Sequence, residues 1–405
     1  MKNPANFLNY IFVVLALTTS ACNGQITKSQ NQKSASTVEN RIVGGGCDGC
    51  ELMYVGMPKD IKSVDYSSGW AEKGQKLLVT GIVYKLDGQT PAPNVIIYYW
   101  QTDNNGYYSP KAEMDERAKR HGHIRGWVKT DKNGKYSIYT IRPAPYPNEN
   151  GPAHIHISIK EPNIANEYYI DEFVFDDDKL LIPAKKKKPL ENRGGSGILR
   201  VLVKDDLQIA EHNIILGLNI PNYPETTKTE KQSGLEIGED NPSFIPFHAW
   251  GQDKGTRACP VCRYGRYHGI IYFVGNNPNW DEIKKWLVFL EQESVKRGKR
   301  LKAYFVYGNQ NNYHKDERQK TLETIGQELD LKNVALTFVP SMSDSESEVN
   351  LNKINPYVEN TIIVFRQRNI IAKFIDLKPL TESFKNISTV FDKSTSEYFS
   401  LPEIH

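Results

Sequence analysis

The stretch that decides the fold is Ile141-Arg142-Pro143-Ala144-Pro145-Tyr146-Pro147-Asn148-Glu149-Asn150-Gly151-Pro152-Ala153-His154-Ile155-His156. Side chains on a β-strand alternate between two faces, so His154 and His156 project together while Ile155 enters the opposite layer. Three prolines around Tyr146 fix φ and exclude a regular helix or a central strand there. The stretch therefore predicts a stiff loop that holds a tyrosine beside two imidazoles able to bind a metal. Taken alone, the His-x-His pair is equally compatible with a surface pair or a packing pair.

The chain around this stretch alternates short apolar runs with turn residues. The runs 78–84 and 94–101 are followed by Asp87-Gly88 and Asn105-Gly106, and such pairs between strands are typical of hairpins. Strands are expected at 78–84, 94–101, 126–130, 135–141, 153–160, 168–175, 198–203 and 209–217. Short strands at this spacing, without a long helical pattern, predict an all-β sandwich or barrel over residues 75–223.

Five motifs follow one another between residues 95 and 156. They are the run 95–103 (Val-Ile-Ile-Tyr-Tyr-Trp-Gln-Thr-Asp), Gly106-Tyr107-Tyr108, Arg125-Gly126 with Thr130-Asp131 and Gly134-Lys135-Tyr136, the run 140–147, and Pro152-Ala153-His154-Ile155-His156. In this order they closely resemble the intradiol ring-cleavage dioxygenases, and the resemblance covers about residues 75–220. It implies a β-sandwich with a non-haem ferric ion, which opens a catechol ring with O2 between the two hydroxylated carbons.

The resemblance also implies the iron ligands. Carried over motif by motif, they are Tyr108, Tyr146, His154 and His156. Phenolate oxygen together with imidazole nitrogen suits ferric iron. Because a tyrosine normally keeps its proton up to a pKa of about 10, only a strong Lewis acid makes two tyrosinates stable at neutral pH. By the same resemblance Tyr146 is the catalytic residue, which the catechol displaces and which then takes up a substrate proton.

Neighbouring residues offer alternatives to these assignments. Tyr107 adjoins Tyr108, but strand alternation lets only one of the two face inward, and the family spacing favours Tyr108. His121 and His123 form a second His-x-His pair. We interpret that pair as part of a solvated loop, because the charge-dense run 111–120 precedes it.

Other polar residues near the motifs are expected to support the site or to lie outside it. Trp100 and Gln101 are expected to pack beside the ligands, and Arg142 is either a pocket residue or a surface arginine. One position departs from the family: where many intradiol dioxygenases carry an arginine just before Pro-Ala-His-x-His, this chain has Gly151. Losing such a preorganised charge costs roughly a few kcal/mol of transition-state stabilisation. Either Arg125 or Arg142 replaces it, or the substrate differs, or catalysis is lost.

Composition limits the number of domains and the class of partner. With 405 residues, 39% hydrophobic, the chain is long enough for two or three domains. A net charge of +3 is too small to indicate nucleic acid as a partner. The lysine run at 185–188 is interpreted as a solvated loop.

The N-terminus has the pattern of an exported lipoprotein. Residues 1–22 combine an early lysine, an apolar run and small residues before Cys22, which is the expected site of lipidation after signal cleavage. Residues 23–40 are polar and predict a flexible tether. No later stretch has the roughly 20 apolar residues of a spanning helix. We therefore expect a bacterial cell-envelope protein, anchored to the membrane by its lipid with its domains outside the cytoplasm.

The other four cysteines form two Cys-x-x-Cys pairs, Cys47/Cys50 and Cys259/Cys262. In an exported protein disulfides are the first expectation, while a common zinc site and redox-active thiols stay open. The first pair lies in a Gly- and Cys-rich lead-in at 41–74, of which residues 41–50 are too irregular for a helix. We expect this lead-in to form a Cys47–Cys50 hairpin disulfide or a loop packed against the iron domain.

After a linker at 224–254, the chain changes to an α/β pattern over 255–405. Strands are expected at 268–274, 302–307, 334–339, 361–365 and 370–375, and helices at 280–296, 317–329 and 380–391. The order strand, helix, strand, helix, strand, strand, strand, helix predicts a mixed sheet. This pattern resembles the thioredoxin-like fold.

The position of Cys259-Pro260-Val261-Cys262 differs from that of a thioredoxin active site. In thioredoxins the pair follows the strand and opens the helix, whereas here it precedes the strand at 268–274, and Asn360 occupies the place of the expected proline. A structural disulfide or a docking module is therefore favoured over dithiol oxidoreductase activity.

Two functions from different classes follow from the sequence. The leading hypothesis is a membrane-tethered ferric intradiol dioxygenase of aromatic-compound catabolism, with a small aromatic diol and O2 as substrates. The alternative is a non-catalytic ligand-binding or thiol-redox partner lipoprotein that reuses both folds. The identity of the catechol and the formation of a homo-oligomer are left open.

Overall fold

The computed structural model describes residues 42–224, 232–311 and 313–404. The expected signal peptide, the tether and Cys22 lie outside these described residues. Among the helices in the described part of the chain, none has both the length and the apolar character needed to cross a bilayer.

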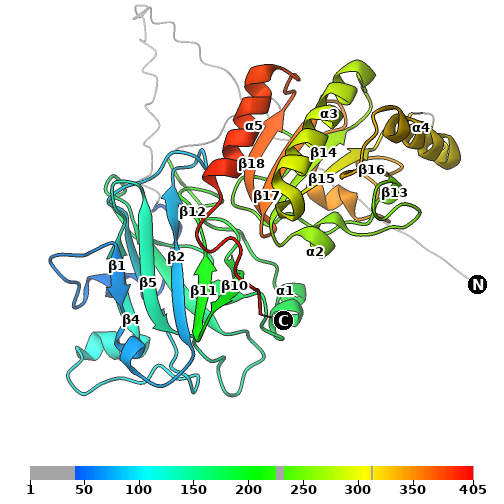
Figure 1. The fold of residues 1–405 in the computed structure, drawn as a ribbon. Coiled ribbons are helices and arrows are strands. Elements are labelled where there is room, and N and C mark those ends of the chain that lie inside the picture. The colour runs from blue at the N-terminus through cyan, green and yellow to red at the C-terminus, as the bar shows by residue number, and fades with distance from the viewer. Residues whose placement is uncertain (1–41, 225–231, 312, 405) are drawn as a thin grey trace, which may run out of the picture. The chain divides into compact units, whose positions relative to one another are not determined.

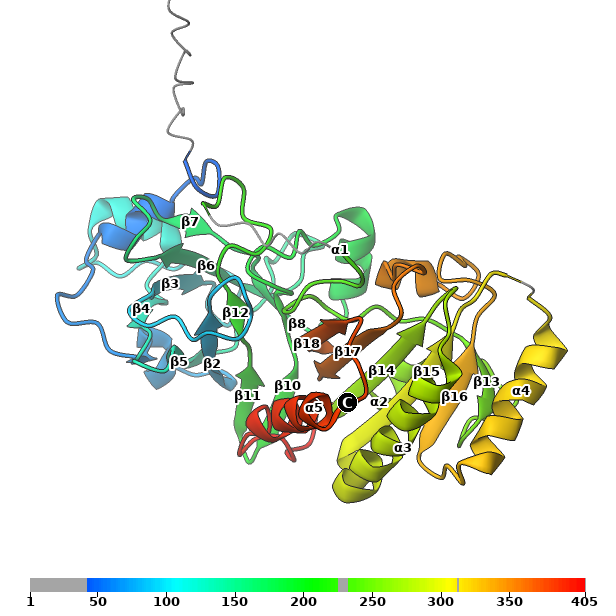
Figure 2. The ribbon, with the colours of Figure 1, turned by 90° about the horizontal axis from the view of Figure 1, so that it is seen from above.

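The first domain is built from two β-sheets (Figures 1 and 2). One sheet contains β1 (Val64–Tyr66), β2 (Lys76–Tyr84), β5 (Lys135–Ile141), β10 (Val201–Lys204), β11 (Leu207–Glu211) and β12 (Ile214–Ile215). The other contains β3 (Ile96–Gln101), β4 (Arg125–Lys129), β6 (His154–Lys160), β7 (Tyr168–Tyr169), β8 (Phe173–Phe175) and β9 (Ile198–Leu199). Within the described residues the strand orders are β1-β5-β2-β11-β10, with β12 beside β2, and β4-β3-β6-β8-β9, with β7 beside β6.

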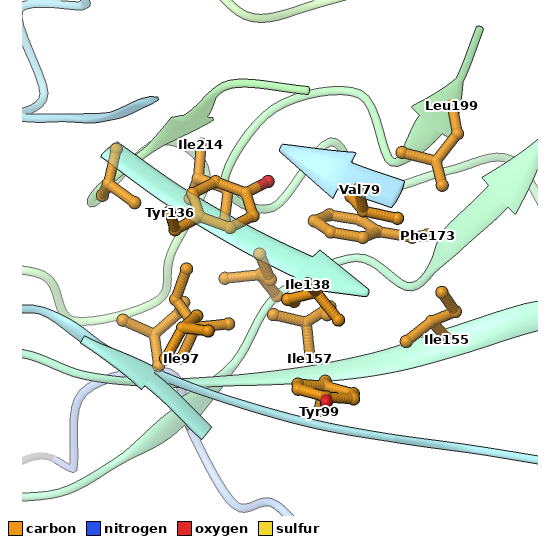
Figure 3. Packing of buried hydrophobic residues seen from close by; sticks show 14 of the residues in the cluster. Val79, Ile97, Tyr99, Tyr136, Ile138, Ile155, Ile157, Phe173, Leu199 and Ile214 are labelled. Atoms are coloured by element: carbon orange, nitrogen blue, oxygen red, sulfur yellow. The ribbon is translucent and has the colours of Figure 1, made fainter. Parts of the chain in front are cut away.

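The core of this domain lies between the two sheets. Figure 3 shows Val79, Tyr136 and Ile138 from one sheet packed against Ile97, Tyr99, Ile155 and Ile157 from the other. On β6 the residues Ile155, Ile157 and Ile159 are fully buried in this core. Because strand side chains alternate, His154 and His156 must lie on the outer face of the same sheet. The expected two-layer sandwich and the expected direction of the two histidines are thus observed.

Several strands differ from their expected bounds. The lead-in at 41–74, in which no strand is expected, contributes β1, which pairs in parallel with β5. It also forms the 3₁₀ turns η1 (Cys50–Tyr54) and η2 (Ser68–Ala71). The strand expected at 168–175 is interrupted between β7 and β8, and the strands expected at 198–203 and 209–217 are each divided into two. Alternation of apolar residues does not reveal such breaks, because local side-chain contacts decide them.

The lysine run at 185–188 is expected to be a solvated loop, and the prediction of a loop is wrong. Its first residues form the end of a short helix, α1 (Leu181–Lys187), with Lys188 as the following residue. The helix is fixed by tertiary packing, since Leu181 is buried beside Val174 and Ile198. The charge of the lysine run gives no indication that Leu181, which precedes it, is buried.

The second domain is a mixed six-stranded sheet within residues 247–375, as far as the chain is described. Its strands are β13 (Phe247–Trp250), β14 (His268–Val274), β15 (Leu301–Tyr307), β16 (Val334–Phe338), β17 (Thr361–Arg366) and β18 (Asn369–Ile375), in the order β13-β16-β15-β14-β17-β18. Its helices are α2 (Pro260–Tyr264), α3 (Trp280–Arg297), α4 (Lys315–Glu328) and α5 (Thr381–Lys393), with 3₁₀ turns η4 (Gly298–Arg300) and η5 (Val349–Asn352). The expected order of strands and helices is observed, whereas the thioredoxin-like assignment stays a prediction.

The expected linker at 224–254 is shorter than its composition indicated. Residues 225–231 lie outside the described chain, but Phe244 is buried in the core of the second domain and β13 joins the edge of its sheet. The run 244–250 is short, interrupted by Pro246, and does not alternate between apolar and polar residues, so its pattern does not predict a strand.

Each Cys-x-x-Cys pair closes on itself as a disulfide, Cys47–Cys50 and Cys259–Cys262. The two pairs therefore do not form a common thiolate site. Cys50 is buried, whereas Cys262 is exposed at the start of α2, ahead of β14 as expected.

His268 makes the stability of the second domain depend on pH. Burial, followed by the charges of Arg366 and Arg297, lowers the pKa of its imidazole to about 3, so the folded domain holds it neutral. The unfolded chain binds a proton near the ordinary pKa of about 6.5, so stability is lost as the pH falls below that value. We expect His268→Gln to reduce the loss of unfolding free energy between pH 7 and pH 5 by about 2 kcal/mol. Urea denaturation at both pH values measures this.

The matched control is His314→Gln, because His314 is exposed. It should leave the pH dependence unchanged. An unaltered pH dependence in His268→Gln would show that this imidazole is not held neutral by the fold.

Candidate metal centre

Four polar side chains of the first domain converge on the outer face of β6. The phenol oxygen of Tyr108 lies 2.7 Å from that of Tyr146 and 2.7 Å from His156 Nε2. The phenol oxygen of Tyr146 lies 3.1 Å from His154 Nε2. The residues expected as iron ligands are thus brought together with two oxygens and two nitrogens facing one another.

Two loops bring the tyrosines to β6. Gly106 has φ 85°, and a Cβ there would lie 2.2 Å from the carbonyl oxygen of Pro145, so the two loops meet where only glycine fits. Asp103 fixes the first loop, because its carboxylate accepts hydrogen bonds from the backbone N–H of Tyr107 at 3.1 Å and from Ser109 Oγ at 2.6 Å. Tyr108 therefore stands on a locked turn.

The second nitrogen of each histidine also has a partner. His154 Nδ1 lies 2.9 Å from the carbonyl oxygen of Pro152, which fixes Nδ1 as the protonated nitrogen and leaves Nε2 free as a ligand. His156 Nδ1 lies 2.5 Å from the hydroxyl of Tyr169 and 3.3 Å from a carboxylate oxygen of Glu172. Such outer partners orient metal-binding imidazoles and set their tautomers.

The protonation of the site follows from burial and charge. Burial, and then the hydrogen bond with Tyr146, raises the pKa of Tyr108 well above its ordinary value, and burial also raises the pKa of Tyr146. Burial of Glu172 would raise its pKa, but the hydrogen bond with His156, followed by the charges of His154 and His156, outweighs this effect and lowers the pKa to about 2. Without a cation both phenols therefore stay protonated beside a carboxylate.

Two sequence expectations about the neighbours hold. Tyr107 is 56% exposed while Tyr108 is partly buried at the cluster, so Tyr108 is the one of the two that faces inward. Trp100 stacks on the ring of His156 at 4.7 Å, and Gln101 donates to the carbonyl oxygen of Ile141 at 2.8 Å. Both residues pack rather than join the cluster.

The interpretation of His121 and His123 as a solvated pair is wrong. His121 ends the 3₁₀ turn η3 (Glu116–His121), is 6% exposed, and stacks on Trp100 at 4.1 Å with the rings 1° from parallel. His123 Nε2 lies 2.8 Å from a carboxylate oxygen of Glu72. Both histidines contact residues that are distant in the sequence, and the charged run that precedes them gives no indication of these contacts.

Neither arginine considered as a replacement at position 151 faces the cluster. Arg142 forms a two-pronged ion pair with Asp177, with N–O distances of 2.7 and 2.8 Å, which excludes the pocket role. Arg125 donates to the carbonyl oxygens of Leu52 and Val55. A Cβ on Gly151 would meet nothing within 4 Å, so the structure leaves room for a side chain at this position.

Tyr169 and Glu172 are the site residues that the sequence did not reveal. They lie in and after β7, where the break between β7 and β8 turns both toward His156. The local signal is the acidic pair Asp171-Glu172 within the otherwise apolar run 168–175. Two adjacent carboxylates would point to both faces of an uninterrupted strand, so they indicate a break there.

Residues 53–188 match the family model described as Dioxygenase. A curated relative is catechol 1,2-dioxygenase of Acinetobacter baylyi, 27% identical over 151 residues, which are 31% of this chain and 47% of that protein. This domain belongs to the intradiol ring-cleavage dioxygenase family. The beta chain of protocatechuate 3,4-dioxygenase of Burkholderia cepacia is 32% identical over 92 residues, 21% of this chain and 39% of that protein.

The match is thus partial on both sides. The chain spans less than half the length of these two intradiol dioxygenases, and most of this chain lies outside the match. Among solved structures, the dioxygenase domain of a carbohydrate-binding fusion from Streptomyces sp. SirexAA-E is 20% identical over 40% of this chain and 91% of that chain, with a TM-score of 0.30. The family of this domain follows from the match to the family model and from the sequence relatives.

The residues present fit a ferric ion. Two phenol oxygens and two Nε2 atoms face a common point, and the outer nitrogens of both imidazoles are engaged elsewhere. An anionic, oxygen-rich set with two imidazoles is the donor set that hard trivalent iron prefers. His154, His156 and Glu172 also form a group close enough to share a cation, so Glu172 adds negative charge at this centre.

Substituting Gly106 tests whether the meeting of the two loops makes the site. We expect Gly106→Ala to lower both the iron content and the melting temperature, because the new Cβ would collide with Pro145 and alanine disfavours a φ of 85°. Metal analysis and thermal unfolding measure the two effects.

Gly151→Ala is the matched control in the same region, since its Cβ would meet nothing within 4 Å. It should change neither quantity. Full iron content in Gly106→Ala would show that the loops can separate without loss of the metal site.

Proposed function

We propose that this protein is a ferric intradiol dioxygenase that opens a catecholic ring between its two hydroxylated carbons with O2. One observation carries the proposal: the phenol oxygens of Tyr108 and Tyr146 converge with Nε2 of His154 and His156. The family of the domain supports the same reaction class. Two relatives are named hydroxyquinol 1,2-dioxygenase, which supports an aromatic diol as the substrate.

The chain's own residues divide the work at this centre. A ferric ion bound by these four side chains would bind the catechol and activate it toward dioxygen. Tyr108 is held on the turn locked by Asp103 and forms the fixed part of the site. Tyr146 belongs to a loop that becomes exposed from Pro147 onward, so its phenol oxygen is the one free to move away and accept a proton from a catechol hydroxyl.

The first test is colour together with oxygen uptake. We expect the purified protein to retain ferric iron, to show a visible tyrosinate-to-iron absorption band, and to convert a catechol to a ring-opened diacid while consuming O2. Tyr108→Phe and Tyr146→Phe should shift or remove the band, because each removes one phenolate. An oxygen electrode, absorption spectra and mass spectrometry of the product measure these outcomes.

Tyr107→Phe is the control, because the Tyr107 side chain is exposed. This variant should keep the tyrosinate-to-iron absorption band and the rate of catechol conversion. A colourless, iron-free protein, or an iron-loaded protein without oxygen uptake on any catechol, would contradict the proposal.

The charges around the site narrow the substrate. The charged side chains that act on the phenol of Tyr146 are Glu172 and Glu149, and both are acidic. Glu149 follows Tyr146 by three residues in a turn whose N–H to carbonyl distance is 3.3 Å. With Arg125 and Arg142 engaged elsewhere, the site favours a neutral or cationic catechol over a catechol carboxylate.

A panel of catechols of similar size and different charge tests this preference. At low salt we expect dopamine and 4-ethylcatechol to have a higher kcat/KM than 3,4-dihydroxyphenylacetate, by about two- to sixfold for each acidic side chain roughly 8 Å away. Glu149→Gln should narrow the difference.

Glu317→Gln, an exposed carboxylate in α4, is the control and should not change the ranking. A preference for the carboxylate substrate in the unmodified protein would contradict the charge argument while leaving the dioxygenase proposal intact.

The alternative function keeps the iron but not the chemistry. Gly151 leaves the position of the family arginine open, and this favours a non-catalytic ligand-binding or redox-partner protein. Iron and colour without oxygen uptake would be its signature.

The location is also a proposal. The N-terminal pattern ending at Cys22 supports an exported, lipid-anchored protein. Closure of both Cys-x-x-Cys pairs as disulfides agrees with an oxidising compartment.

A further inference from the structure

We propose that the loop 47–55, closed by the Cys47–Cys50 disulfide, is part of the metal centre: it positions the ligand His156 through a stack of His121 and Trp100. The inference rests on the proposed function in that His156 is taken as a ligand. Residues 47–52 precede the stretch that matches the family model, so the match does not account for them.

The stack runs without a gap from the loop side of the domain to the ligand. The ring of Trp100 stacks on two imidazoles. Its centroid lies 4.1 Å from that of His121, with the ring planes 1° from parallel, and 4.7 Å from that of His156, with the planes 14° apart. Trp100 and His156 are also directly paired across β3 and β6, so the backbone keeps their rings in register. A hydrogen bond at Nδ1 still allows an imidazole to rock, whereas contact with a flat ring fixes its plane.

The far end of the stack is fixed by the loop. Gly49 has φ 89°, and a Cβ on it would lie 3.0 Å from His121 Nε2 and 2.8 Å from Arg120, so the loop backbone rests directly on the imidazole. On its other side, His121 Nδ1 lies 2.8 Å from the hydroxyl of Tyr98, which is fully buried. His121 therefore cannot shift unless the loop does.

The loop itself is tied to the sheet that carries the ligands. Ser158, on the same face of β6 as His154 and His156, donates to Cys50 Sγ at 2.9 Å. Met53 is fully buried against Tyr98 and Trp100, and its carbonyl oxygen accepts from Trp127 Nε1 at 2.7 Å. The disulfide thus belongs to a segment that contacts His121 through Gly49 and Trp100 through Met53.

This arrangement gives His121 and Trp100 a role that burial alone would not require. The hydrogen bond with Tyr98 satisfies Nδ1 of His121 inside this apolar cluster and leaves the imidazole parallel to the ring of Trp100. We therefore treat Trp100 and His121 as positioning residues for His156, acting from behind it without touching the metal.

The first experiment compares Trp100→Ala with Trp100→Phe in the full chain. We expect Trp100→Ala to weaken ferric-iron affinity about 10- to 100-fold, as loss of outer support of a metal ligand commonly does, and to shift the visible band. Trp100→Phe keeps a flat ring and should restore most of both. The readouts are a competitive chelator titration and the band position, neither of which depends on turnover.

Two further pairs of variants distinguish an effect of the loop 47–55 on iron affinity from a general loss of stability. Gly49→Ala drives a Cβ into His121, whereas Gly45→Ala carries a similar left-handed φ of 74° with nothing within 4 Å. The double variant Cys47→Ser with Cys50→Ser opens the loop, and Cys259→Ser with Cys262→Ser opens the other disulfide of the chain. Only the first member of each pair should lower iron affinity.

Histidine-selective ¹⁵N NMR of the metal-free protein separates this inference from the proposed function. The His156 resonance should be a single sharp tautomer in the unmodified protein and in Trp100→Phe, and should broaden in Trp100→Ala and Gly49→Ala. If the protein binds no iron, the proposed function fails while this spectrum still decides the positioning claim. An unchanged His156 resonance, or equal iron affinity within each pair, would overturn the inference.

Discussion

The alternation of side chains along β6 is the constraint on which the rest of the site depends. Ile155, Ile157 and Ile159 are buried between the sheets, and burying side chains of this size contributes roughly 1.5–3 kcal/mol each. A slip by one residue would expose all three and bury both histidines, so the hydrophobic core itself holds His154 and His156 on the outer face. The two imidazoles are therefore held as rigidly as the sandwich that carries them.

Everything else at the site is added to that face from distant parts of the chain. The loop of Tyr108 and the loop of Tyr146 meet at Gly106, β7 supplies Tyr169, and the lead-in supplies the segment behind Trp100. Each addition satisfies a different atom: the phenol oxygens face the Nε2 atoms, while Tyr169 and Glu172 engage His156 Nδ1. The chemistry thus combines a core-fixed pair of nitrogens with oxygens on loops, and the loop of Tyr146 has the fewer restraints.

The sequence predicted the parts of this site that are coded locally. Alternation and turn pairs located the strands, and the motif spacing selected Tyr108 over Tyr107. It could not reveal partners that meet only in three dimensions. The charged run 111–120 indicates a solvated His121, whereas in the fold the ring stacks on Trp100 and Gly49 lies against it. The helix α1 was missed for the same reason, since Leu181 and its partners Val174 and Ile198 are close only after folding. In the second domain the predicted order of strands and helices from residue 268 onward agrees with the structure. No motif in that part of the sequence indicates a function.

The central claim is that two tyrosinates and two imidazoles hold a ferric ion. Resonance Raman spectroscopy of the iron-loaded protein, excited in its visible band, tests it most directly. The claim predicts enhanced tyrosinate ring vibrations, which shift when the protein is labelled with deuterated tyrosine and lose one component in Tyr146→Phe. A spectrum without tyrosinate vibrations in an iron-loaded protein would contradict it, and would indicate that the ion is held instead by the group of His154, His156 and Glu172.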